Sequence, residues 1–137
     1  ERVAAAARRS RVVLTARAEN CVRGRPDLDD TIRRLQAFEK AGADVLMAPG
    51  LPDLESVRKV CAALAKPFNF MAGIKGKSFS VPELNAAGAR RISLAGSLWR
   101  ATMGGLVEAA REVKEKGTFG YVERSPAAAD LVKIMSS

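Results

Sequence analysis

The sequence has no histidine among its 137 residues, few aromatic residues and only two cysteines. Without histidine there is no Ser-His-Asp or Cys-His pair and no His-ligated metal, so acid–base work would fall to Asp, Glu, Lys, Tyr or Cys. Cys21 and Cys61 form no C-x-x-C motif, and because the given sequence shows no signal-peptide pattern we expect reduced thiols in a cytosol-like compartment, the cytoplasm. No apolar run approaches the roughly 18 residues that a membrane-spanning helix needs.

The net charge of +8 raises nucleic acid as a possible partner. Aromatic residues make up only 5% of the chain, so platforms for base stacking are scarce. The basic residues also form no single stripe but scattered pairs, at Arg8/Arg9, Arg33/Arg34, Arg58/Lys59 and Arg90/Arg91. A role in nucleic-acid binding is therefore disfavoured against solvated helix faces, and the salt dependence of DNA binding would test it.

Short apolar segments alternate with amphipathic helical patterns along the chain. Strands are expected at 11–17, 44–50, 68–73 and within 86–96. Helices are expected from Leu28 to Gly42, over 52–66, from Val81, over 98–116, and over 125–135 with Ser125 as N-cap and Pro126 in the first turn. The strand starts are spaced by about 23 to 32 residues, the length of a βα unit. Strands that are apolar throughout are typical of parallel strands covered on both faces.

Gly-Lys-Ser at 76–78 has the ending of a phosphate-binding loop, G-x-x-x-x-G-K-[ST]. The position of the first glycine is occupied by Met71. Ser80 and Glu83 form a capping box, which starts the next helix too late for its N-terminus to share a phosphate with the lysine. The segment is better interpreted as a flexible loop after the third strand, and its lysines are optional ligands.

Polar and small residues stand at the carboxyl ends of the expected strands, the edge where α/β enzymes bind ligands. Arg17 and Glu19 follow the first strand, Asn69 belongs to the third, and Gly96 follows the fourth. An arginine fork matches two oxygens of a carboxylate or phosphonate, and a glycine lets backbone N–H groups approach. We expect a pocket for a small anion. Two alternatives stay open: Arg17 pairs with Glu19 at the surface, or Asn69 caps local backbone.

The sequence resembles the isocitrate lyase / phosphoenolpyruvate mutase superfamily, in particular its carboxyvinyl-carboxyphosphonate phosphorylmutase or oxaloacetate-processing branch. The resemblance covers about Arg11 to Leu106 and continues more weakly to the end. It rests on four segments: LTARAEN, GRPDLDDTIRRLQAFEKAGADVLMAPGLPDLESVRKVC, KPFNFMAG and FSVPELNAAGARRISLAGS. Their combination is far more specific than any one of them.

The resemblance implies the C-terminal half of a (β/α)8 TIM barrel, with four parallel βα units plus a C-terminal helix in one domain spanning 1–137. It implies Mg²⁺ and a lyase or hydrolase that acts on a small 2-oxo acid or phosphonate through an enolate-like species. By position, the family's substrate-binding arginine falls on Arg17, its strand-seven asparagine on Asn69, and its last backbone contacts around Gly96. Pro49 stands where the lyase members have a glutamate, which weakens isocitrate-lyase-type activity.

The resemblance also implies a missing partner. The family's Mg²⁺-binding carboxylates lie in the first half of the barrel, so no metal ligand is expected in this chain, and a whole barrel needs roughly 250 residues. We expect an N-terminal half barrel or a second copy to complete the sheet. We also expect a homo-oligomer in which the helix 125–135 packs on a neighbouring subunit through Leu131, Ile134 and Met135. The chain alone is expected to be inactive; the alternative is a non-catalytic remnant or assembly module of the same fold.

Overall fold

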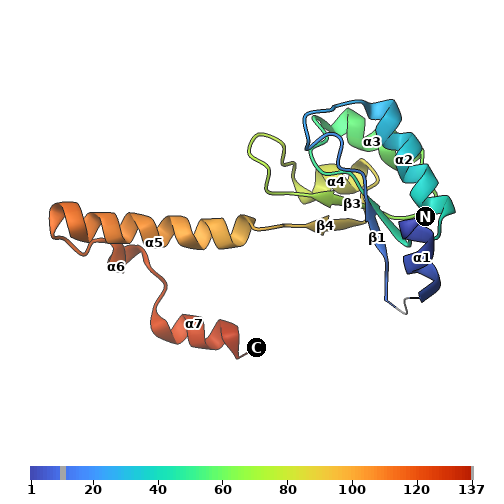
Figure 1. Cartoon of the computed structure of the whole chain (residues 1–137). Coiled ribbons are helices and arrows are strands. Elements are labelled where there is room, and N and C mark those ends of the chain that lie inside the picture. The colour runs from blue at the N-terminus through green and yellow to red at the C-terminus, as the bar shows by residue number, and fades with distance from the viewer. Residues whose placement is uncertain (10–11, 137) are drawn as a thin grey trace. The chain divides into compact units, whose positions relative to one another are not determined.

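The computed structural model describes residues 1–9 and 12–136 and divides the chain into two compact units, Glu1–Ser97 and Leu98–Ser137. Figure 1 shows the strands and short helices of the first unit and the helices of the second. Each unit is described by itself below. None of the described helices combines the length and apolarity needed to cross a bilayer.

The first unit is built on a parallel sheet of four strands in the order β1-β2-β3-β4. The strands are β1 (Thr15–Arg17), β2 (Val45–Met47), β3 (Phe68–Met71) and β4 (Arg91–Ser93). Because spatial order follows chain order and every pair is parallel, each connection is a βα unit, as the spacing predicted. The α/β class and the four parallel units are therefore confirmed, although each strand is shorter than its apolar run.

The helices of this unit are α1 (Arg2–Arg9), α2 (Leu28–Lys40), α3 (Leu54–Ala62) and α4 (Val81–Ala86). Three begin at side-chain caps: Asp27 accepts from the backbone N–H of Asp30 at 2.8 Å, and Asp53 accepts from that of Ser56 at 2.7 Å. Ser80 and Glu83 form the predicted capping box, so α4 starts at Val81. The expected late helix start after Gly-Lys-Ser is confirmed.

The core lies between one face of the sheet and α2–α4. Leu46 pairs with Phe68 and Phe70 with Ile92 in the register, so these apolar side chains share a face. The helices contribute Leu35, Val57, Val60 and Leu84, and all belong to the same buried cluster. Residues of opposite parity, which include Arg17, Met47 and Asn69, point to the other face of the sheet, hereafter the site face.

The two outer strands are more exposed than the two central ones. All three residues of β2 are buried, as are the first three of β3, whereas β1 and β4 have exposed or half-buried positions. Within the described part of the chain each outer strand pairs with one neighbour only. Val12 and Val13, just before β1, are 73% and 71% exposed. Outer strands that are exposed and partly apolar agree with a sheet that is part of a larger barrel.

The second unit contains most of α5 (Ser97–Lys116), with α6 (Tyr121–Arg124) and α7 (Ala128–Met135). Glu112 holds the turn between α5 and α6, because it accepts from Thr118 Oγ1 at 2.9 Å and from Arg124 Nη2 at 3.2 Å. The hydrogen bond from Thr118 is the largest of the causes that lower the pKa of Glu112. None of the described residues of these three helices is buried.

The expected start of the last helix was wrong. Ser125 does not cap α7; its hydroxyl donates to the carbonyl of Tyr121 at 2.8 Å and ends α6 instead. Ser125 has ψ 146°, extended backbone, because a residue before proline is pushed out of the helical region. The helix therefore begins at Ala128. Leu131, Ile134 and Met135 are exposed in this chain, and their packing on a neighbouring subunit stays a prediction.

Candidate active site

Arg17, Met47 and Asn69 lie in one row across the site face. The register pairs Arg17 with Met47 and Met47 with Asn69, and Ala16, next to Arg17, belongs to the core on the opposite face. The row contains the last residue of β1, the last residue of β2 and the second residue of β3. The structure therefore brings two of the predicted site residues to the same face, across one intervening strand.

Arg17 and Glu19 form an ion pair, with Nη2 of the arginine 2.5 Å from Oε1 of the glutamate. The other carboxylate oxygen, Oε2, lies 3.5 Å from Nε of Arg23. Both partners of the first pair are partly exposed, so solvent weakens the attraction. The ion pair between Arg17 and Glu19 that was the open alternative is therefore present, and substrate binding by these two residues stays a prediction.

Asn69 is buried, with 1% of its surface exposed. Its Nδ2 donates to Ser93 Oγ at 3.0 Å, a contact between β3 and β4 rather than the local backbone cap that was the alternative. Its Oδ1 is enclosed and accepts no hydrogen bond from any described residue. Leaving such an oxygen unpaired costs about 1–3 kcal/mol, so Asn69 is held in an orientation that suits a further donor.

Three connecting loops meet at this end of the sheet. Gly73, at φ +107°, leaves no room for a side chain, because a Cβ there would lie 2.9 Å from Cβ of Ser97 and 3.0 Å from the carbonyl oxygen of Leu94. The loop after β3 is thereby packed on the turn after β4, which contains Gly96. Ala95 in that turn has φ +49°, a conformation that non-glycine residues rarely adopt and that is often found at functional sites.

Lys77, in the loop after β3, connects that loop to a neighbouring turn. Lys77 Nζ donates to the carbonyl of Gly50 at 3.3 Å and so joins the loop after β3 to the turn after β2. A side chain on Gly50 would in turn meet the backbone of Val22 at 3.1 Å, which places the loop after β1 against the same turn. Lys75 is exposed, and no side-chain partner is found for it among the described residues.

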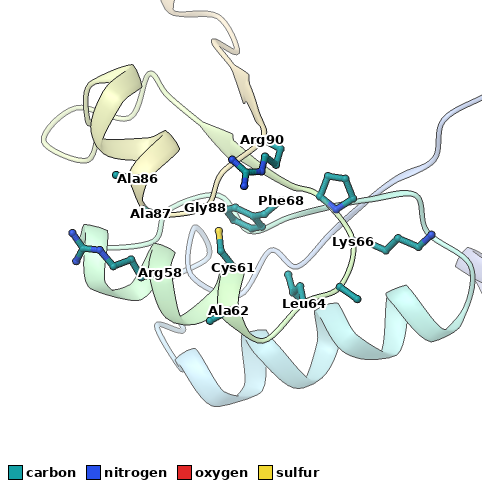
Figure 2. A pocket seen from close by; sticks show the side chains of 12 residues that line it. Arg58, Cys61, Ala62, Leu64, Lys66, Phe68, Ala86, Ala87, Gly88 and Arg90 are labelled. Carbon is teal, nitrogen blue, oxygen red and sulfur yellow. The ribbon is translucent and has the colours of Figure 1, made fainter.

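A hollow of about 500 Å³ lies at the end of the sheet where the strands begin (Figure 2). It is lined by α3, by the residues around Phe68 that begin β3, and by the turn at Gly88 before β4. Ligand sites in parallel α/β folds lie at the carboxyl ends of strands, so this hollow is not the candidate active site. Figure 2 shows the sulfur of Cys61 directed toward Phe68.

Cys61 offers a test of this packing. Burial raises the pKa of its thiol from 9.0 to about 11, against a weaker opposing effect of the Arg90 charge. In a Cys21→Ser variant we expect alkylation by iodoacetamide at pH 8 to be about 100-fold slower than in the urea-unfolded chain, because the thiolate is rarer. The contribution of this thiol to stability should be present below pH 9.0 and lost as the pH rises toward 11. An alkylation rate that levels off near pH 9 in the folded protein would contradict this.

The fold defines an α/β protein of repeated βα units, with an arginine and an asparagine on one face of its parallel sheet. Comparisons with known proteins show which family has this fold. The family model for phosphoenolpyruvate phosphomutase matches residues 1–114, and the chain belongs to that family. Comparison with the curated proteins gave no match.

Three solved structures illustrate the relationship. A candidate lyase/mutase from Burkholderia cenocepacia J2315 is 41% identical, with a TM-score of 0.90 over 99% of this chain and 51% of its own. Oxaloacetate acetylhydrolase, solved with the inhibitor 3,3-difluorooxalacetate, is 25% identical, with a TM-score of 0.78 over 97% of this chain and 46% of its own. The fold is shared by 2,3-dimethylmalate lyase, a member of the PEP mutase/isocitrate lyase superfamily, with a TM-score of 0.74. The chain spans about half the length of these structures.

Proposed function

We propose that this chain forms the C-terminal half of a (β/α)8 enzyme that acts on a small 2-oxo acid or phosphonate. The observation that carries the proposal is the row of Arg17 and Asn69 on one face of the sheet, in a chain of the phosphoenolpyruvate phosphomutase family. The inhibitor in the oxaloacetate acetylhydrolase structure, a difluorinated oxaloacetate, supports the substrate class.

The proposed roles follow from the contacts. Arg17 offers its planar guanidinium to a carboxylate or phosphonate. Glu19 holds that guanidinium in place through their ion pair. Asn69, fixed by Ser93, offers its unpaired oxygen Oδ1 as an acceptor to a donor in the complete site. Backbone N–H groups of the turn at Gly96 supply further donors. Such fixed donors would stabilise the enolate-like charge that develops when a bond next to a carbonyl is broken.

Mg²⁺ is expected in the complete enzyme, but the residues of this chain do not fit it. No three His, Cys, Asp or Glu side chains in the described part of the chain lie close enough together to hold a metal ion. Glu19, the acid next to the candidate site, is already paired with two arginines. The carboxylates of a Mg²⁺ site would therefore come from outside these residues, as the family resemblance implies.

An assay of the intact protein tests this function. Pyruvate or oxalate release from oxaloacetate and related 2-oxo acids would be measured with and without Mg²⁺, and we expect turnover only with the metal. No turnover on any 2-oxo acid or phosphonate would overturn the proposal. The alternative, a non-catalytic remnant or assembly module, is favoured only by the lack of a metal-ligand cluster among the described residues. It would be supported by an intact protein that binds such acids without converting them.

The proposal also requires a partner for the two outer strands. We propose an N-terminal half barrel or, in its absence, a second copy, in a homo-oligomer in the cytoplasm. Light scattering on the 137-residue chain by itself should give a mass well above the 14.6 kDa of one copy, because β1 and β4 would pair with other chains. A well-folded monomer of that mass would contradict the requirement for a partner.

A further inference from the structure

A second, smaller hollow lies beside the candidate active site. It encloses about 390 Å³ and is lined by Glu19, Asn20, Arg23, Arg25 and Arg34. Four of these residues belong to the loop after β1, and Arg34 belongs to α2. Two segments of the chain thus converge on one site of the size that small ligands occupy.

The charges of this hollow are unbalanced. Among the described residues, three arginines and one acid, Glu19, line the hollow, and the shorter contact of Glu19 is to Arg17 rather than to Arg23. The side chain of Arg25 makes no hydrogen bond or ion pair with any described residue. Arg34 is bound to Asp30 through Nε alone, at 2.5 Å, which leaves its terminal nitrogens available. An anion would therefore meet donors that the protein itself does not satisfy.

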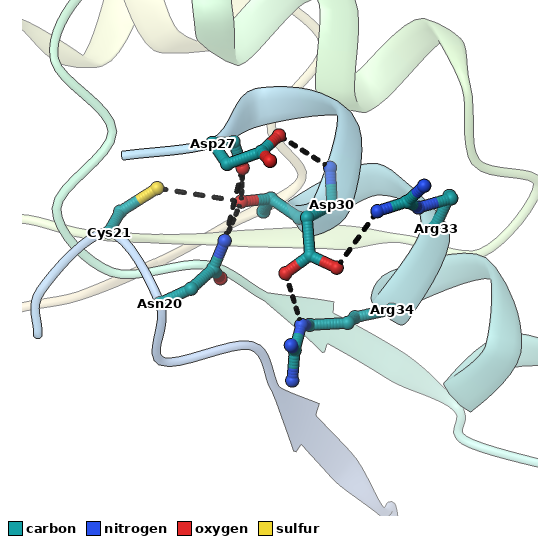
Figure 3. Close-up of polar contacts among 7 residues, drawn as sticks. Asn20, Cys21, Asp27, Asp30, Arg33 and Arg34 are labelled. Atoms are coloured by element: carbon teal, nitrogen blue, oxygen red, sulfur yellow. Dashed lines mark hydrogen bonds and ion pairs between the residues drawn. The ribbon is translucent and has the colours of Figure 1, made fainter. Parts of the chain in front are cut away.

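The loop that carries these arginines is fixed to α2. Asn20 is 8% exposed, and its Nδ2 donates to Thr31 Oγ1 at 2.5 Å and to the carbonyl of Asp27 at 3.1 Å (Figure 3). The carbonyl of Asn20 accepts from the backbone N–H of Arg25 at 2.9 Å. Oδ1 of the same residue is enclosed and accepts nothing from the described residues. The backbone that carries these arginines is therefore held in place by hydrogen bonds to α2.

The hollow is separate from the row of site residues. Arg17 lies on the site face, whereas α2, which carries Arg34, packs against the opposite face of the sheet. Glu19 lies between the two, with one oxygen toward Arg17 and the other toward Arg23. Arg17 does not line the hollow. A ligand there would be a second anion, not the substrate proposed above.

We propose that the hollow binds a small polyanion of the phosphate class. Guanidinium groups match phosphate oxygens in a bidentate manner, and several of them favour a ligand with more than one negative charge. None of the described residues that line the hollow is aromatic, so none of them would stack on a nucleic-acid base. The partners of such a ligand are Arg25, Arg34 and, once displaced from Glu19, Arg23.

Calorimetric titration of the intact protein with pyrophosphate tests this site. We expect saturable binding that weakens with added salt, because part of the attraction is between exposed charges. Arg25→Ala and Arg34→Ala should each weaken the binding about tenfold or more, since each removes a charge-assisted hydrogen bond. Arg33→Ala is the matched control, because Arg33 also pairs with Asp30 but does not line the hollow. It should change the affinity less than twofold.

Three results would overturn the proposal: no saturable pyrophosphate binding to the wild-type protein, an equal loss in Arg33→Ala, or equally tight binding of citrate. An equal loss in the control would mean that diffuse surface charge does the binding. Equal citrate binding would mean that the site selects charge rather than phosphate. Arg25→Gln repeats the test with a side chain of similar polarity and volume, and thermal unfolding of each variant checks that the fold is intact.

Discussion

Replacing Arg17 by alanine should lower kcat/KM of the intact enzyme for its 2-oxo acid about 100-fold. The variant loses a charged, bidentate partner of the substrate. Removing one such oxyanion donor from an enzyme lowers the rate by about 100-fold or more. It also leaves the Glu19 carboxylate near the substrate without the Arg17 charge that offset it. Steady-state kinetics of pyruvate or oxalate release would measure the effect.

Two further variants separate the fork from the charge. Arg17→Lys keeps the charge but cannot form the bidentate contact, so it should recover only part of the activity. Arg33→Ala removes an exposed arginine of α2 that pairs with Asp30, and it should leave the kinetics unchanged. If Arg17→Ala retained more than half of the wild-type kcat/KM, Arg17 would be a surface ion pair and the proposed site would be wrong.

Local sequence signals predicted α2, α3 and α4 best, because each of these helices begins where a side chain accepts a hydrogen bond from its own backbone. Asp27 and Ser80 cap α2 and α4 where the sequence placed the starts, since a cap needs only residues two or three positions away. The strands were overestimated. The run 11–17 is apolar along most of its length, but only Thr15–Arg17 pairs with β2, and residues 10 and 11 lie outside the described part.

The site was predicted in outline but not in its contacts. Chain order alone places Arg17 and Asn69 at the same end of a parallel sheet. The bond between Asn69 and Ser93 and the bond between Lys77 and Gly50 depend on register and loop packing, which no local pattern encodes. The hollow beside Arg34 is not predictable from the sequence for a related reason, because only the folded loop brings Arg23 and Arg25 to it. The spacing of four residues between Glu19 and Arg23 does indicate their ion pair.

The contrast between the two units of the chain follows from what each can bury. The first unit closes a core between the sheet and α2–α4, whereas none of the described residues in the helices of the second is fully buried. Leu98, Trp99 and Leu106 of α5 are at least 59% exposed. Helices gain most of their stability from packing an apolar face, so the exposed apolar side chains of α5 and α7 suit a partner surface. This agrees with the proposed oligomer.

Leu46→Ala should destabilise the intact protein by about 2–5 kcal/mol, the range for removing a fully buried leucine side chain. Leu46 is at the centre of β2, has 0% exposure, and pairs with Phe68 in the register, so the cavity would open between the sheet and the helices. Urea unfolding followed by circular dichroism measures the loss.

Leu46→Met keeps the volume and should cost less than about 1.5 kcal/mol. Val81→Ala, at a position 66% exposed on α4, should stay within about 0.5 kcal/mol. If Leu46→Ala matched Val81→Ala, the core would not lie on this face of the sheet. The assignment of Arg17 and Asn69 to the opposite face would then fall with it.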